Sequence, residues 1–359
     1  MQNANRYLVQ LAACGVAVSL LLAGFIVLID PYRAFDTPSI AGINTIKPRA
    51  AQRSDLSKSR ILERTHARTV LLGNSRVEIG LNPASDKWPA ERRPVINAAQ
   101  AGTPLSKSIC RLKEAIAAGR PTLIVLGVDI QDFLVAQQPL ESMPNKIPAK
   151  RTGCDTAHLM WSTLFSISSL VDAVLTAIGQ DTQTGATIEA NGFNPMREYQ
   201  AHVRRVGYVG LFEQKLSEYT KEYKKKPSSN FIEPDRYLPF RDLRNIMRIS
   251  SAEGIDLVIY FHPYHGQFLD LLRAAGLWDS FEAWKQQVYA MAAEESRGRL
   301  TAIRVLDFSG YNEITTEIVP TDKAAPMKWY WEPGHYKSEL GDIIIEEVVR
   351  GSGSRLLPN

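Results

Sequence analysis

Ser75 follows a short apolar run, residues 69–72, and is separated from it only by Gly73 and Asn74. Apolar, partly β-branched residues that end abruptly in Gly-Asn-Ser predict a buried strand running into a tight turn. A serine at that point lies at the carboxyl end of a strand, where ligands bind in open α/β sheets. The N–H groups of a following helix could stabilise an oxyanion there. The same segment would also suit a serine that only caps a helix or closes a turn.

Glu332 and His335 are the candidate partners of Ser75. A serine becomes a nucleophile when a base, most often histidine, takes its proton, and a carboxylate fixes the tautomer of that histidine. Glu332 and His335 are three residues apart with Pro-Gly between them, so on a tight loop both could point to one side. This pattern predicts an acid and a base for Ser75.

Further polar or aromatic residues follow the predicted strands or flank these motifs, and each has two interpretations. Arg76 could clamp a substrate carboxylate or phosphate, or pair with a structural acid. His262 and His265 could contact substrate or act as an alternative base, or they could pack at a strand end. Trp331, next to Trp329 and Tyr330, could form a sugar-stacking wall or belong to a packed cluster.

The elements that must position these residues alternate between strands and helices. We expect parallel strands near 69–72, 94–97, 121–127, 255–261 and 302–308, with helices near 48–66, 104–118, 266–275 and 278–296 and a last helix to about 350. This rhythm predicts a three-layer α/β fold. Right-handed crossovers place the carboxyl ends of all the strands at one edge of the sheet. Residues 134–240 interrupt the rhythm, and we interpret them as a mostly helical cap or lid, with helices near 155–178, 209–225 and 235–252.

The N-terminus predicts a membrane anchor. Residues 7–29 carry no charge, and 23 residues suffice to span a bilayer. The run lacks a good cleavage site, which favours an uncleaved transmembrane helix over a signal peptide, and too few apolar residues precede Cys14 for a lipoprotein signal. We expect residues 1–6 in the cytoplasm, a linker at 30–47 and a domain at 48–359 outside. Four basic residues after the span argue for the opposite orientation, but long domains translocate regardless of such charges.

Composition narrows the remaining possibilities. The net charge is only +4, and no basic stretch is interleaved with aromatic residues, so nothing indicates nucleic-acid binding. Cys14 lies in the predicted span. Cys110 and Cys154 could form a disulfide in an oxidising compartment or remain free thiols.

Taken in order, four segments resemble the blocks of the SGNH hydrolase superfamily, whose fold is a flavodoxin-like α/β/α sandwich. They are Gly73-Asn74-Ser75, residues 97–102 ending in Gly102, Gly127-Val128-Asp129, and residues 332–335 before the last helix. The resemblance covers about 65–135 and 255–350. It implies Ser75 as nucleophile, His335 as base and Glu332 as acid, with an oxyanion hole at Ser75 and Gly102. Asp129 stands where the family has an asparagine, and an ionised aspartate cannot donate a hydrogen bond.

An N-terminal span before such a domain resembles the alginate O-acetylation proteins and the D-alanyl transfer protein of teichoic acid synthesis. This resemblance implies a periplasmic or exterior domain that works beside a membrane-bound acyltransferase. We therefore expect an acyltransferase or esterase that acts on a cell-surface glycan or glycolipid without a cofactor. The alternatives are an inactive scaffold or binding protein of polymer modification or export, and a metal-dependent phosphoesterase that uses Asp129, His262, His265 and His335.

Overall fold

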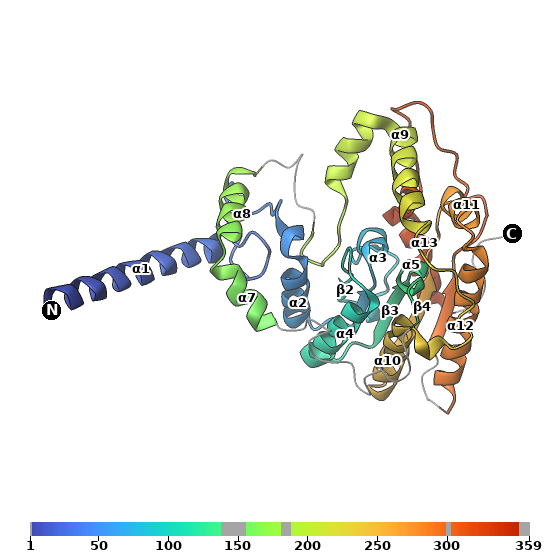
Figure 1. The fold of residues 1–359 in the computed structure, drawn as a ribbon, viewed down its shortest axis with the longest axis horizontal. Coiled ribbons are helices and arrows are strands. Elements are labelled where there is room, and N and C mark those ends of the chain that lie inside the picture. The colour runs from blue at the N-terminus through green and yellow to red at the C-terminus, as the bar shows by residue number, and fades with distance from the viewer. Residues whose placement is uncertain (1, 138–155, 181–187, 299–302, 352–359) are drawn as a thin grey trace. The chain divides into compact units, whose positions relative to one another are not determined.

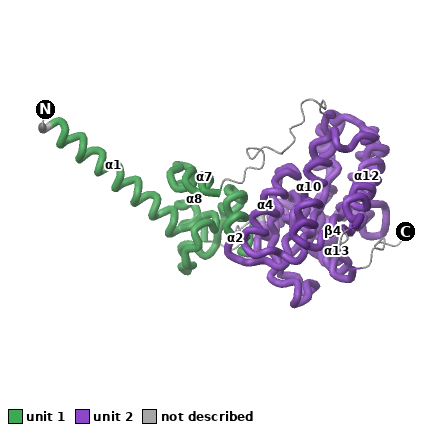
Figure 2. The backbone as a smooth tube through the Cα atoms, turned by 90° about the horizontal axis from the view of Figure 1, so that it is seen from below, with its two compact units in different colours: residues 1–60, 155–190 green, residues 61–154, 191–359 purple. Residues whose placement is uncertain are grey.

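The computed structural model describes residues 2–137, 156–180, 188–298 and 303–351. The chain forms two compact units (Figure 2). Unit 1 comprises residues 1–60 and 155–190, and unit 2 comprises residues 61–154 and 191–359.

Unit 2 is built on a five-stranded parallel sheet, as the sequence predicts. Its strands have the order β2-β1-β3-β4-β5. They are β1 (Thr69–Leu72), β2 (Val95–Asn97), β3 (Leu123–Val128), β4 (Asp256–Phe261) and β5 (Ile303–Asp307). The strands β1 and β3 are buried over their whole length because helices cover both faces of the sheet, and this explains their uninterrupted apolar sequences.

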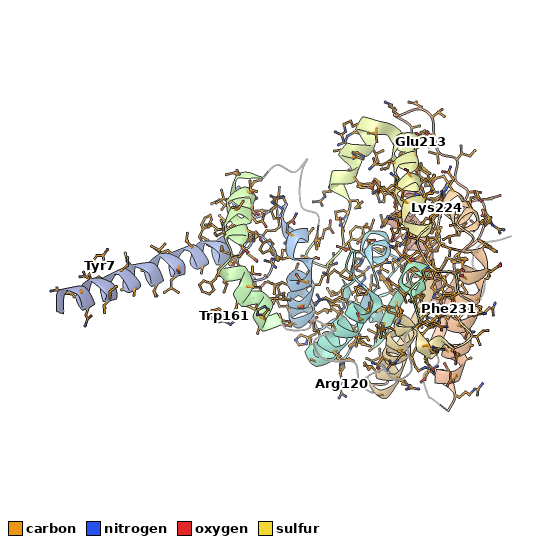
Figure 3. All side chains as sticks on the ribbon, in the orientation of Figure 1. Tyr7, Arg120, Trp161, Glu213, Lys224 and Phe231 are labelled. Carbon is orange, nitrogen blue, oxygen red and sulfur yellow. The ribbon has the colours of Figure 1, made fainter. Side chains whose placement is uncertain are left out.

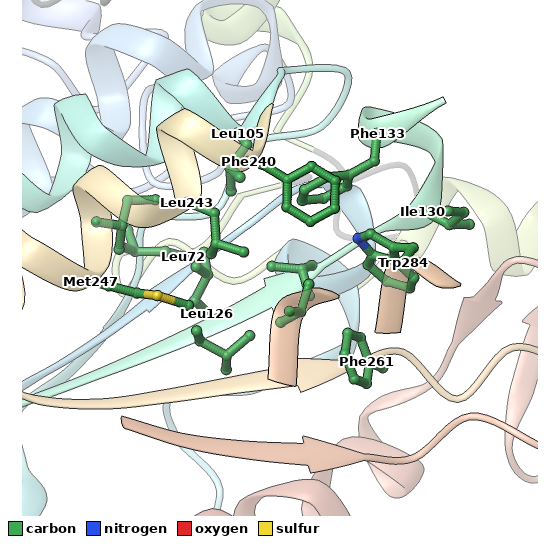
Figure 4. Packing of buried hydrophobic residues seen from close by; sticks show 14 of the residues in the cluster. Leu72, Leu105, Leu126, Ile130, Phe133, Phe240, Leu243, Met247, Phe261 and Trp284 are labelled. Atoms are coloured by element: carbon green, nitrogen blue, oxygen red, sulfur yellow. The ribbon is translucent and has the colours of Figure 1, made fainter. Parts of the chain in front are cut away.

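Alternate strand residues enter two separate cores. Leu72 and Leu126 pack with the helices α4 (Leu105–Gly119), α10 (Leu238–Ala252), α11 (Gly266–Ala274) and α12 (Trp278–Ser296) (Figure 4). Leu71 and Val125 point to the opposite face. There they meet the last helix, α13 (Ser338–Arg350), and part of the long helix α9 (Arg197–Tyr223). The period of two along each strand produces this division.

Short elements complete unit 2 at the carboxyl edge of the sheet. The helices α3 (Ser75–Gly80) and α5 (Ile130–Phe133) follow β1 and β3 (Figure 1). The strands β6 (Tyr330–Glu332) and β7 (His335–Tyr336) form an antiparallel hairpin before α13. Single 3₁₀ turns lie at Ala50–Arg53, Ala90–Arg92 and Pro234–Arg236.

The predicted insertion at 134–240 does not form one cap. The helix expected at 155–178 is two helices, α7 (Thr156–Leu164) and α8 (Ile167–Ile178), which bend by 72° and belong to unit 1. In unit 2, α10 is a layer helix of the sheet, because its apolar face with Phe240 and Leu243 is buried against the main core. The long helix α9 includes the stretch expected near 209–225 but begins earlier and is kinked at Gly207.

Unit 1 joins the N-terminal helix α1 (Gln2–Ile29) and α2 (Ser54–Thr65, divided between the units) to α7 and α8. Within the described residues, α1 is the helix that is by itself long and apolar enough to cross a membrane, as a membrane anchor or a signal sequence would be. It contains the predicted span at 7–29. Cys14 is a free thiol on α1. Cys110 is disulfide-bonded, and Cys154 lies outside the described residues.

Candidate functional site

The turn from β1 into α3 presents Ser75. Gly73 has φ of +141°, and a Cβ there would lie 2.5 Å from Val77 Cγ2 and 2.8 Å from the carbonyl oxygen of Gly127. The turn therefore requires glycine at this position. Asn74 caps α3, because its side chain accepts a hydrogen bond of 3.0 Å from the Arg76 N–H. Ser75 is thus the first residue of the helix and is half-buried at the edge of the sheet.

Ser75, His335 and Glu332 form a hydrogen-bonded relay. The distance from Ser75 Oγ to His335 Nε2 is 2.8 Å. The other ring nitrogen, Nδ1, contacts Glu332 Oε1. Glu332 is fully buried, and the His335 side chain is 19% exposed. A serine hydroxyl, an imidazole and a carboxylate are therefore in contact in that order, which is the arrangement that can activate a serine.

The β6–β7 hairpin fixes the acid and the base. Glu332 and His335 face each other across the hairpin, and the Gly334 N–H donates to Glu332 Oε2 at 3.0 Å. Tyr219 on α9 donates its hydroxyl to Glu332 Oε1 at 3.1 Å. Burial raises the pKa of Tyr219, with Glu332 adding to the effect, so this phenol remains a donor. Sequence reasoning missed Tyr219 because it lies in the insertion, where no motif signals a contact with the hairpin.

The Glu332 carboxyl stays ionised inside the protein. Burial acts to raise its pKa, but His335, the Gly334 N–H and Arg76 together lower the pKa below its ordinary value. The carboxylate can therefore hold the Nδ1–H tautomer of His335, which leaves Nε2 free to accept the proton of Ser75.

Asp129 and Arg76 form a buried ion pair behind the relay. Arg76 Nη1 contacts Asp129 Oδ2, and the two side chains are 3% and 0% exposed. Arg76 Nε also donates to the Gly334 carbonyl at 2.7 Å, which ties α3 to the hairpin. These contacts fit the interpretation of Arg76 as the partner of a structural acid, and they tie it to the hairpin that carries Glu332 and His335.

Asp129 accepts hydrogen bonds from three further groups. The Tyr264 hydroxyl and the Gln131 N–H donate to Asp129 Oδ1 at 2.9 and 3.0 Å. The side-chain amide of Asn74 donates to Asp129 Oδ2 at 2.9 Å. The Asp129 carboxylate accepts from all of these groups and from Arg76. Because an ionised carboxylate has no proton to donate, Asp129 cannot serve as an oxyanion donor. It stands at the centre of a network that joins β1, β3 and β4.

We expect Asp129→Asn to destabilise unit 2 by about 3–5 kcal/mol, because the buried guanidinium of Arg76 loses its counter-charge. Urea unfolding followed by circular dichroism measures the change. The matched control is Asp256→Asn, whose partner Arg92 lies 3.3 Å away in a pair with side chains 32% and 49% exposed. The control should cost less than about 1 kcal/mol. Equal losses in the two variants would contradict a structural role for the Arg76–Asp129 pair.

The two strand-end histidines have structural positions. His265 caps α11, where Nδ1 accepts from the Gln267 N–H at 3.2 Å and Nε2 lies 2.9 Å from the Glu317 carbonyl. These partners fit one neutral tautomer, with the proton on Nε2. The interpretation as packing at a strand end fits His265 better than a substrate contact.

His262 is completely buried against the rings of Tyr260, Tyr264 and Tyr336. Burial, helped by Arg76 and His335, lowers its pKa well below the ordinary value, so the ring stays neutral. Neither ring nitrogen has a hydrogen-bond partner among the described residues. Complete burial fits packing at a strand end better than a substrate contact, and the histidine that contacts Ser75 is His335.

The segment that carries Gly102 is attached to the Ser75 turn. The Gln100 N–H donates to the Gly73 carbonyl at 3.0 Å, and the Ala101 N–H donates to Glu78 on α3 at 2.6 Å. Gly102 itself is exposed and has φ of +67°. A Cβ added at Gly102 would have no atom of the described residues within 4 Å. Two of the predicted oxyanion residues, Ser75 and Gly102, therefore belong to segments bonded to each other.

Trp331 lines a cavity of about 670 Å³ beside the hairpin. The cavity is bounded by the first half of α9, the loop 323–326 and Lys337. Lys337 Nζ lies 4.6 Å from the centre of the Trp331 ring and donates to Tyr208 Oη at 2.8 Å. Trp331 is half-buried and is next to Glu332 in β6, where successive side chains point to opposite faces. Ser75, Glu332 and His335 do not line this cavity.

The residues of the phosphoesterase alternative do not gather around one point. Within the part of the chain that the structure describes, no group of three or more His, Cys, Asp or Glu side chains could hold a metal ion. Asp129, His262 and His265 instead have the separate structural positions given above.

Comparison of the chain with protein-family models, with curated proteins and with solved structures found no match.

Proposed function

We propose that the chain is a membrane-anchored, extracytoplasmic serine acyltransferase or esterase of the SGNH type. Its substrate would be an ester-linked acyl group of a cell-surface polysaccharide or glycolipid. The observation that carries this proposal is the Ser75–His335–Glu332 relay. The strand order 2-1-3-4-5, which is that of flavodoxin-like folds, supports the SGNH resemblance.

The proposed chemistry uses one proton carrier in both half-reactions. His335 Nε2 takes the proton of Ser75 Oγ while the oxygen attacks the acyl carbonyl carbon, and Glu332 stabilises the imidazolium that forms. The tetrahedral intermediate then expels the donor alcohol or thiol, which receives the proton from His335. The resulting acyl-Ser75 ester is attacked by a sugar hydroxyl or by water, with His335 again taking the proton and returning it to Ser75.

The oxyanion would be stabilised by backbone groups alone. We assign the N–H groups of Ser75 and Gly102 to it, because the two segments are bonded together and Asp129 is occupied by its own donors. The loss of one oxyanion donor typically costs about 10²–10³ in kcat. The proposed enzyme is therefore expected to be slower than relatives that keep a side-chain donor.

Three features support the proposed cellular setting. Helix α1 would be the anchor, with residues 1–6 in the cytoplasm and unit 2 outside. The disulfide at Cys110 fits an oxidising compartment. The cavity lined by Trp331 offers an aromatic ring to a sugar. In this setting a membrane-bound acyltransferase partner would supply the acyl group.

One observation favours a second candidate, an inactive scaffold or binding protein of the same envelope system. The Arg76–Asp129 ion pair occupies the place where the SGNH family has a side-chain oxyanion donor. A scaffold would retain the Trp331 cavity and bind glycan, whereas changes at Ser75 and His335 would have no effect in cells.

A fluorophosphonate probe tests the proposed enzyme, because it reacts covalently with activated serines. We expect labelling of the full chain and complete loss of labelling in Ser75→Ala. The control is Ser338→Ala, since Ser338 also begins a helix and is half-buried, but its hydroxyl donates to Glu339 Oε2 at 3.4 Å. Absence of labelling in the folded wild-type chain would favour the scaffold.

A further inference from the structure

Helix α8 in unit 1 exposes an apolar stripe. Ile167, Val171, Val174 and Ile178 are 83%, 49%, 45% and 74% exposed. Their spacing of four, three and four residues places them on one face of the helix. A helix of a water-soluble unit has the opposite pattern, with polar residues on its exposed face.

The other face of α8 is already in use. Leu170, Ala173 and Ala177 pack against Ile26 and Ile29 at the end of α1. The exposed stripe is therefore not the side by which α8 joins its unit, and it needs another environment.

The charged side chain of α8, Asp172, contacts other residues of unit 1. Asp172 receives a hydrogen bond of 2.7 Å from the Tyr32 hydroxyl and lies 3.1 Å from Arg49 Nε. It is the one Asp, Glu, Lys or Arg between 156 and 178. The exposed stripe is consequently free of charge along its whole length.

Helix α7 continues the apolar surface. Trp161, which is labelled in Figure 3, is 63% exposed. Phe165 is 55% exposed, and the centres of the two stacked rings are 5.7 Å apart. Leu159 and Met160 pack inward on Leu56 and Tyr32. Exposed aromatic side chains of this kind are enriched at the boundary between lipid and water.

Neither helix of the bent pair is long enough by itself to cross a membrane in a straight line. The 12 residues of α8 extend about 18 Å at 1.5 Å per residue, whereas the hydrocarbon core is about 30 Å thick. The bend of 72° prevents α7 from extending α8 into a straight span. A short helix with an uncharged apolar face suits the plane of the interface.

We propose that α7 and α8 form an interfacial foot, which inserts Trp161, Phe165 and the stripe of α8 into the bilayer that α1 spans. This inference rests on the anchoring role of α1 given under the proposed function. Lipid is the occupant because the foot packs on the last turns of α1, where Leu21 and Leu28 are themselves 74% and 48% exposed. The foot therefore extends an apolar surface that the anchor already presents to lipid.

Spin labels on the full chain in lipid nanodiscs, one chain per disc, test the foot. Ile167→Cys and Ile178→Cys are made in a Cys14→Ser background, and collision rates with oxygen and with a water-soluble nickel chelate are measured. The matched control is Ile318→Cys, because Ile318 is 87% exposed on unit 2. A label on native Cys14 of the wild-type chain reports on α1 alone.

We expect the oxygen-to-nickel ratio at 167 and 178 to exceed the ratio at 318 several-fold. Equal ratios at the three sites would place the stripe in water and overturn the foot. Protection from both reagents at 167 and 178 would show that protein covers the stripe, and it would also overturn the proposal. A water-like ratio at Cys14 would instead refute the anchor, so the two failures are distinguishable.

Discussion

Ser75→Ala is expected to lower the kcat for ester cleavage by at least about 10³-fold, with a similar loss for His335→Ala and no further loss in the double variant. Ser75 Oγ and His335 Nε2 are 2.8 Å apart, so the two side chains act together. The hydroxyl is a poor nucleophile until Nε2 takes its proton. Once either member is removed, the other has no further contribution to lose.

Hydrolysis of p-nitrophenyl acetate by the purified full chain measures these rates without knowledge of the natural acceptor. Ser338→Ala again serves as the control, because it removes a helix-initial hydroxyl whose partner is Glu339. Losses that multiply in the double variant would show that Ser75 and His335 act independently. Full activity in Ser75→Ala would remove Ser75 from the mechanism.

The sheet and the relay could be anticipated because their signals are local. Buried parallel strands need apolar side chains on both faces, so β1 and β3 stand out as continuous runs. Parallel strands end at a common edge, and that rule brings Ser75 near residues far away in sequence. Glu332 and His335 needed only a tight turn between them, which the hairpin provides.

The supporting residues could not be anticipated in the same way. Arg76 and Asp129 could each have faced solvent, and only the packing of α3 against β3 and the hairpin buries them as a pair. The sequence predicts one cap at 134–240 because these residues interrupt the alternation of strands and helices. Whether a helix covers the sheet, as α10 does, or joins the N-terminal unit, as α8 does, depends on tertiary contacts.

Glu332→Gln is expected to lower kcat by about 10³–10⁴-fold while leaving the hairpin folded. The neutral amide cannot stabilise the imidazolium of His335. It can also turn an N–H toward Nδ1, which favours the tautomer with the proton on Nε2, and that nitrogen then cannot take the proton of Ser75. The control is Glu339→Gln, an exposed acid at the start of α13, which should retain full activity.

Glu332→Gln should also change how the free energy of unfolding depends on pH. The pKa of Glu332 is lower in the folded chain than its ordinary value of about 4.3–4.5, so its ionised form stabilises the fold above that value. This contribution is lost as the pH falls through the lowered pKa, whereas glutamine has no proton to gain. The excess stability of the wild type over Glu332→Gln should therefore shrink as urea unfolding is repeated from about pH 6 downward. A constant difference between the two curves would mean that Glu332 is not held as a carboxylate, and it would remove the orienting acid from the proposed relay.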